Sequence, residues 1–107
     1  HPEFGFSVLS FRKEVIDEYP EAIEKFLAAV EQAVEKINAD PSQYAGLMAE
    51  QGLVPPPLME SYTVNPFPTA GVPSQAQWDD AVDWALHKGL ISDSVDYQSS
   101  VTGEYLP

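Results

Sequence analysis

The feature that most constrains what this chain can fold into is an apolar run at residues 4–11. In an extended conformation Phe4, Phe6 and Val8 lie on one face, and Leu9 and Phe11 lie on the other. Strands with two apolar faces are normally buried on both sides within a sheet. No second convincing strand follows, so we expect the partners of this strand to come from polypeptide outside these residues or from another copy of the chain.

The rest of the sequence predicts helices. Apolar residues recur at three- and four-residue spacing over residues 20–38, and Asp40-Pro41 blocks any continuation of that helix. A shorter helix is expected over residues 42–51, and a long one over residues 74–88, where Ser74 and Gln77 have the form of a capping box.

The same periodicity predicts which residues of the two later helices face inward. The expected inward faces are Tyr44, Leu47 and Met48 in one helix, and Trp78, Ala81, Val82, Ala85 and Leu86 in the other. The predicted fold class is mostly α with one or two strands. We expect residues 1–107 to be a single C-terminal fragment, divided into a crossing strand at 1–11 and a helical portion at 12–107.

The charge balance excludes several classes of partner. Seventeen acidic residues against five basic ones give a formal net charge of -12. A nucleic-acid binder needs a lysine and arginine footprint, and an anionic membrane surface would repel this chain. No apolar run approaches the roughly 20 residues of a membrane-spanning helix.

Few residues are candidates for chemistry. The sequence has no cysteine, and His87 is its only internal histidine, near the end of a predicted helix where a surface or capping role is typical. Asp79, Asp80 and Asp83 could suggest a hard-metal site, but carboxylates spaced along a helix usually form a solvated face. The same interpretation applies to Glu14, Asp17, Glu18, Glu21 and Glu24. We assign no catalytic residue, no metal ligand and no cofactor, and we predict that the chain is not an enzyme.

Three aromatic residues allow two interpretations. Trp84 lies six positions after Trp78 and therefore points toward a second surface, where it stacks on a ligand or, as we favour, packs against another part of the protein. Tyr97 and Tyr105 carry the same alternatives.

The order of these elements resembles the C-terminal region of periplasmic solute-binding proteins for nitrate, sulfonates, taurine and thiamine pyrimidine precursors. The resemblance rests on the helix that begins at Pro20, on the Asn38-to-Pro41 turn, on Trp78 to Trp84 and on Gly89-Leu90-Ile91. The closing residues 102–107 are similar to the thiamine-precursor branch, although asparagine is more usual where Gly103 stands.

The resemblance implies the C-terminal portion of a two-lobed α/β periplasmic-binding-protein fold of type II. The implied function is the substrate-binding component of an ABC importer for a small organic solute or anion, in the periplasm or outside the cell, with or without a lipid anchor. Its implied partners are a membrane permease, the solute, and an N-terminal part of the protein before His1. The ligand-binding residues stay unknown, although residues 4–7 are expected to pass near the solute.

Two alternatives remain open. One is a pyrimidine-synthesis enzyme of the related family, whose members rely on histidine and cysteine residues. The other is a stand-alone acidic helical interaction module whose N-terminal strand adds to a partner's sheet. Dimerisation or strand exchange through residues 4–11 is compatible with an excised piece.

Overall fold

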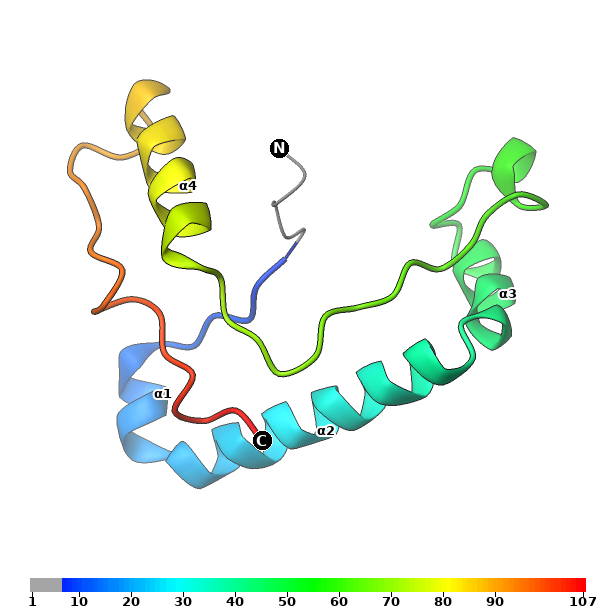
Figure 1. Cartoon of the computed structure of the whole chain (residues 1–107), viewed down its shortest axis with the longest axis horizontal. Coiled ribbons are helices and arrows are strands. Elements are labelled where there is room, and N and C mark those ends of the chain that lie inside the picture. The colour runs from blue at the N-terminus through cyan, green and yellow to red at the C-terminus, as the bar shows by residue number, and fades with distance from the viewer. Residues whose placement is uncertain (1–6) are drawn as a thin grey trace. The chain divides into compact units, whose positions relative to one another are not determined.

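The computed structural model describes residues 7–107, and about half of the chain is helical. The elements, in chain order, are α1 (Lys13–Glu18), α2 (Pro20–Ala39), α3 (Ser42–Glu50), the 3-10 turn η1 (Pro56–Leu58) and α4 (Gln75–His87) (Figure 1). The three helices predicted over 20–38, 42–51 and 74–88 are confirmed, each to within about one residue at either end.

The prediction of one or two strands is wrong for the described residues. Residues 7–107 contain no strand and no sheet, so the chain belongs to a helical class and not to the predicted portion of a two-lobed α/β fold. The described part of the expected crossing strand, residues 7–11, is irregular, and residues 1–6 lie outside the described residues. The physical reason is that a strand needs a hydrogen-bonded neighbour, and residues 7–107 contain no second strand to supply one.

The chain forms two compact units. In the first unit, described over residues 7–23 and 71–106, contacts of Trp78 and Tyr97 join α4 to the segment that follows it. The Trp78 indole N–H donates to the Val95 carbonyl at 2.8 Å, and the Tyr97 hydroxyl donates to the Pro73 carbonyl at 2.8 Å. The two rings meet edge to face, with centroids 6.5 Å apart.

In the second unit, residues 24–70, an extended segment passes along α2 (Figure 1). The Asn38 side-chain amide pairs with the backbone of Phe67, donating to its carbonyl and accepting from its N–H, each at 2.8 Å. The Ala70 N–H donates to the Glu31 carboxylate at 2.9 Å. We call these two contacts the loop clasps.

The spacing of the loop clasps explains why both form. Glu31 and Asn38 are seven residues apart, or about 10.5 Å along a helix. Phe67 and Ala70 are three residues apart, or about 10–11 Å in an extended chain. The two lengths match, so one face of α2 satisfies backbone groups at both ends of the segment. Ala70 adopts a positive φ of 32°, which costs a residue with a Cβ about 1–2 kcal/mol, and its bond to Glu31 helps to offset this cost.

Local signals set the helix ends. Ser74 and Gln77 form the predicted capping box at the start of α4. Gly52 and Gly89, with φ values of 67° and 68°, follow α3 and α4 in the left-handed conformation that glycine tolerates best. After each glycine a leucine N–H bonds back to the helix, Leu53 to Met48 and Leu90 to Ala85. This is the pattern of a Schellman motif.

Candidate interaction surface

Burial is sparse in both units. The buried apolar residues among those described are Ile23, Val54 and Val64, whereas fourteen large apolar side chains are exposed. Leu47 and Ala81 are exposed although the helical period predicts them to face inward, whereas their predicted neighbours Met48 and Val82 are half-buried. Among the described residues, exposed large apolar side chains therefore outnumber the fully buried ones.

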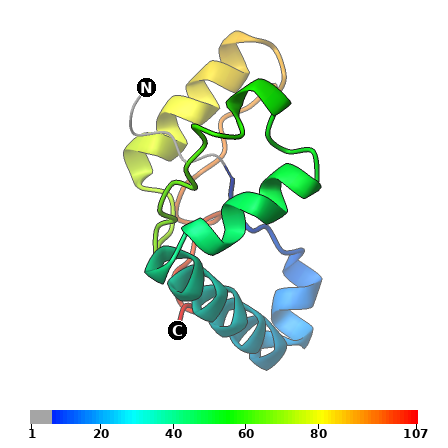
Figure 2. The same ribbon diagram turned by 90° about the vertical axis from the view of Figure 1, so that its right-hand side faces the viewer.

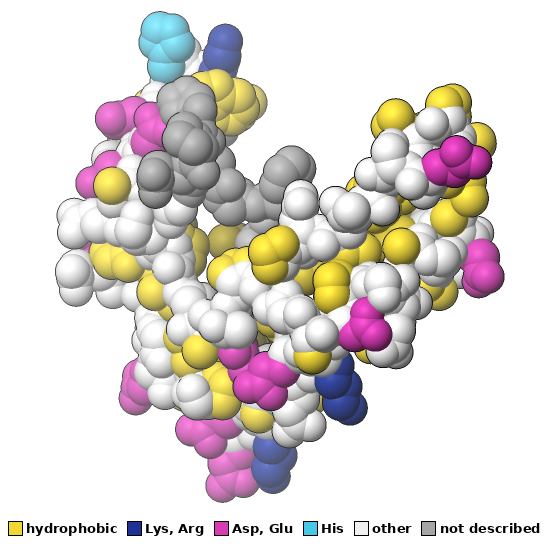
Figure 3. All heavy atoms as spheres, turned by 45° about the vertical axis from the view of Figure 1, so that its right-hand side comes forward, with side chains coloured by type: hydrophobic (Ala, Val, Ile, Leu, Met, Phe, Trp, Pro, Cys, Tyr) yellow, Lys and Arg dark blue, Asp and Glu magenta, His cyan; other side chains and the backbone are white. Residues whose placement is uncertain are grey.

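A group of exposed apolar side chains lies in the second unit, at α3, at η1 and in the residues that connect and follow them. We call it the apolar arm and define it by Leu47, Leu53, Leu58 and Met59, which are 51%, 65%, 53% and 46% exposed. Val54, which follows Leu53 in the chain, is buried, and the Leu53 N–H donates to the Met48 carbonyl. Apolar side chains gather over this part of the molecule in Figure 3.

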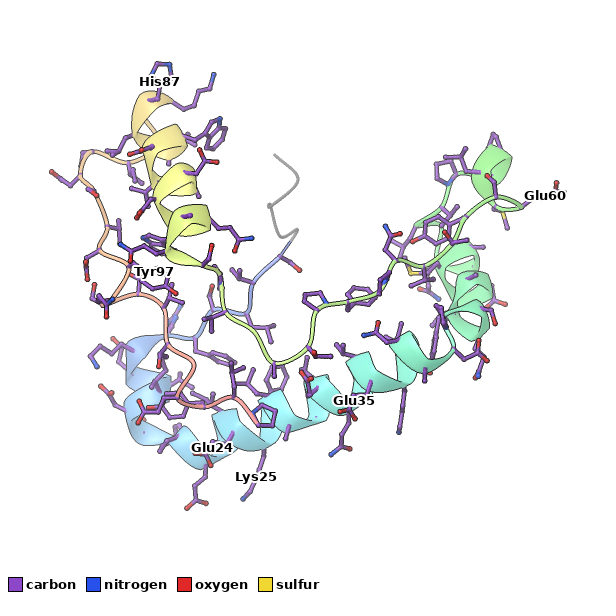
Figure 4. The ribbon with its side chains drawn as sticks, in the orientation of Figure 1. Glu24, Lys25, Glu35, Glu60, His87 and Tyr97 are labelled. Atoms are coloured by element: carbon purple, nitrogen blue, oxygen red, sulfur yellow. The ribbon has the colours of Figure 1, made fainter. Side chains whose placement is uncertain are left out.

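The charged residues at the apolar arm are acidic. Glu50 ends α3 and Glu60 follows Met59; both are exposed, and Glu60 points outward (Figure 4). Residues 37–87 contain no lysine or arginine. The apolar arm is therefore an apolar surface with an acidic border.

The Asp40 side chain organises the start of α3. Figure 2 shows the turn from α2 to α3 from a second direction. The Asp40 carboxylate accepts hydrogen bonds from the Ser42 hydroxyl at 2.5 Å and from the Gln43 side-chain amide at 2.7 Å. The bond from Ser42, followed by that from Gln43, lowers the pKa of Asp40 because both favour the ionised form. This carboxylate has a local structural role.

The acidic residues predicted as a solvated face are exposed. Asp79, Asp80 and Asp83 lie on α4, and Glu14, Asp17, Glu18, Glu21 and Glu24 lie on or beside the first two helices. Asp17 pairs with Lys13 at 3.2 Å, and Glu18 accepts a bond from the Tyr19 hydroxyl, which raises the pKa of Tyr19 together with some desolvation. Within the described part of the chain no group of three or more side chains is placed to hold a metal ion.

The aromatic candidates and His87 differ in how far they are exposed. Tyr97 makes packing contacts within the first unit: its hydroxyl donates to the Pro73 carbonyl and its ring meets that of Trp78 edge to face. Tyr105 is half-buried. Trp84 is 57% exposed, and His87 is exposed at the end of α4 (Figure 4). Of the segment expected to pass the solute, only Ser7 is described, and it is exposed.

The loop clasps and the apolar arm were not identified from sequence. The available signal for the clasps was two polar residues, Glu31 and Asn38, at seven-residue spacing along the edge of the apolar stripe of α2. For the arm it was the run of Leu53, Val54, three prolines, Leu58 and Met59, which combines apolar residues with a segment that cannot extend a helix.

Comparisons with known proteins add no relative: no family model, no curated protein and no solved structure matches this chain. None of the helices within residues 7–107 combines the length and the apolar character that crossing a bilayer requires.

Proposed function

We propose that this chain is a helical part of the substrate-binding component of an ABC importer, one that takes up a small organic solute or anion. The proposal is supported by the order of sequence signals from Pro20 to the closing residues 102–107, which resembles such proteins for thiamine pyrimidine precursors, nitrate and sulfonates. In this proposal the role of the chain is to pack against the polypeptide that binds the solute.

The observation that carries the packing role is the balance of burial. Among the described residues the buried apolar side chains are those of Ile23, Val54 and Val64, whereas fourteen large apolar side chains are exposed. Covering the exposed ones with further polypeptide would add stability, because removing apolar surface from water is favourable.

In the proposed mechanism the solute binds the closed arrangement of the importer's binding component better than the open one, and so shifts the population toward closure. In that process the helices of this chain support the polypeptide that binds the solute. We assign no solute contact to any residue of these helices.

The test is a solute screen on the full-length product of the gene that encodes this chain, with thermal unfolding as the readout. We expect one of nitrate, taurine, an alkanesulfonate or a thiamine pyrimidine precursor to raise the Tm. A ligand at one hundred times its Kd adds about 2.7 kcal/mol of stability. Chloride at matched ionic strength is the control for nitrate. A folded protein whose Tm responds to no member of the panel would contradict the proposal.

A second candidate, an acidic helical interaction module, is favoured by the helical class of residues 7–107. The two candidates differ in the behaviour of the 107-residue chain alone. A module is expected to elute in size exclusion as a stable monomer. Dimerisation that depends on residues 4–11 would instead favour a piece that needs more polypeptide.

A further inference from the structure

We propose that the apolar arm docks on a polypeptide surface whose apolar centre is bordered by lysine and arginine. The proposal rests on the packing role proposed above and adds to it the surface used and the chemistry of its partner.

The arm is prearranged for docking. Leu53 follows Gly52 in the Schellman motif that ends α3, and the motif fixes the leucine backbone while its side chain stays 65% exposed. Leu58 lies in η1, whose backbone is restricted by three consecutive prolines. Apolar anchors that are already held in place lose little conformational entropy on binding, which favours affinity.

Charge identifies the occupant. Glu50 and Glu60 border the arm, and residues 37–87 contain no lysine or arginine to balance them. A second copy of the chain would bring two arms of the same sign together, with a net charge of -12 on each chain. An anionic membrane would be repelled for the same reason. A surface with an apolar centre and a basic border would bury the leucines and would pair with the charge of the glutamates.

The experiment measures binding of the 107-residue chain to three synthetic amphipathic helices by fluorescence anisotropy. The first has a leucine face edged by lysine, the second has the same face edged by glutamate, and the third keeps the lysines but replaces leucine with alanine. We expect the first to bind at least tenfold more tightly than either of the others.

Two pairs of substitutions locate the binding. Leu58→Ser with Met59→Ser is expected to weaken binding of the lysine-edged helix by about tenfold or more, because two apolar contacts are lost. Leu90→Ser is the control outside the arm, since Leu90 is 64% exposed and takes the same Schellman position after α4 that Leu53 takes after α3. Glu50→Gln with Glu60→Gln is expected to weaken binding severalfold and to reduce its salt dependence.

Far-UV circular dichroism checks that each variant keeps its helix content, so that lost binding reports the surface. The proposal is overturned if the lysine- and glutamate-edged helices bind equally, if Leu90→Ser weakens binding as much as the arm substitutions, or if the chain prefers itself or anionic vesicles. If no solute raises the Tm but the lysine-edged helix binds selectively, the importer function is contradicted and the docking surface is not. If a solute raises the Tm but the lysine-edged helix does not bind selectively, the docking surface is contradicted and the importer function is not.

Discussion

Asn38 uses a side-chain amide where a neighbouring strand would use a peptide group. Its oxygen and nitrogen bond to the N–H and carbonyl of one residue, Phe67, so a single side chain satisfies both backbone groups. This matters because the extended segment has no strand partner among the described residues, and unpaired backbone groups are costly wherever water is excluded.

Replacing Asn38 with alanine is expected to lower the free energy of unfolding by about 1–2 kcal/mol, because two hydrogen bonds are lost. Alanine is also the better helix former, which offsets part of that loss. Hydrogen exchange of the Phe67 amide is therefore the more direct measurement, and it should accelerate. Asn65→Ala is the matched control in the same segment. Equal exchange in the two variants would contradict the assignment.

Asp40 predicts a pH dependence. Its pKa is lowered in the folded chain, so its contribution to stability is present above the ordinary aspartate value of about 4 and is lost as the pH falls below it. Thermal unfolding between pH 7 and 3 should therefore show a smaller acid loss of stability in Asp40→Asn than in the unchanged chain. Glu50→Gln removes one carboxylate elsewhere and serves as the control. A parallel acid loss in Asp40→Asn and the unchanged chain would show that the bonds from Ser42 and Gln43 contribute nothing.

At the scale of the element, α4 is specified at both of its ends by its own sequence. The capping box satisfies N–H groups at its start, and Gly89 ends it. Such local signals explain why the helices could be predicted from sequence to within about one residue.

Ser74→Ala should remove half of the capping box and lower stability by about 1 kcal/mol, with a range of about 0.5–2 kcal/mol for such caps. The measurement is urea unfolding followed at 222 nm. Ser94→Ala, an exposed serine in the segment after α4, should leave the midpoint unchanged. If both variants unfold at the same urea concentration, the capping box has no energetic role.

The parts that sequence did not predict depend on distant partners. Whether residues 7–11 form a strand depends on a neighbour that a local pattern does not reveal, and the two-sided apolar pattern was therefore misleading. Leu47 fits the inward face of a helix by its period, yet it is 51% exposed. The sequence thus predicted Leu47 as a core residue, whereas the structure places it at the surface, in the apolar arm.

At the scale of the whole molecule, the net charge of -12 opposes the folded state through self-repulsion. Raising sodium chloride from 0.02 to 0.3 M, concentrations chosen to shorten the screening length from about 20 Å to about 6 Å, should therefore raise the Tm by several degrees. Potassium chloride should act equally, since screening depends on ionic strength. A Tm that falls with salt would show that specific ion pairs outweigh the repulsion.

The loop clasps also decide where the chain tolerates a change of length. Adding one residue between Phe67 and Ala70 would place either amide out of register with its acceptor on α2, because the helix supplies acceptors at fixed intervals. The segment from Phe67 to Ala70 therefore has a fixed length, set by the pitch of α2. An inserted epitope or dye-labelling site placed within it would break at least one of the two clasps.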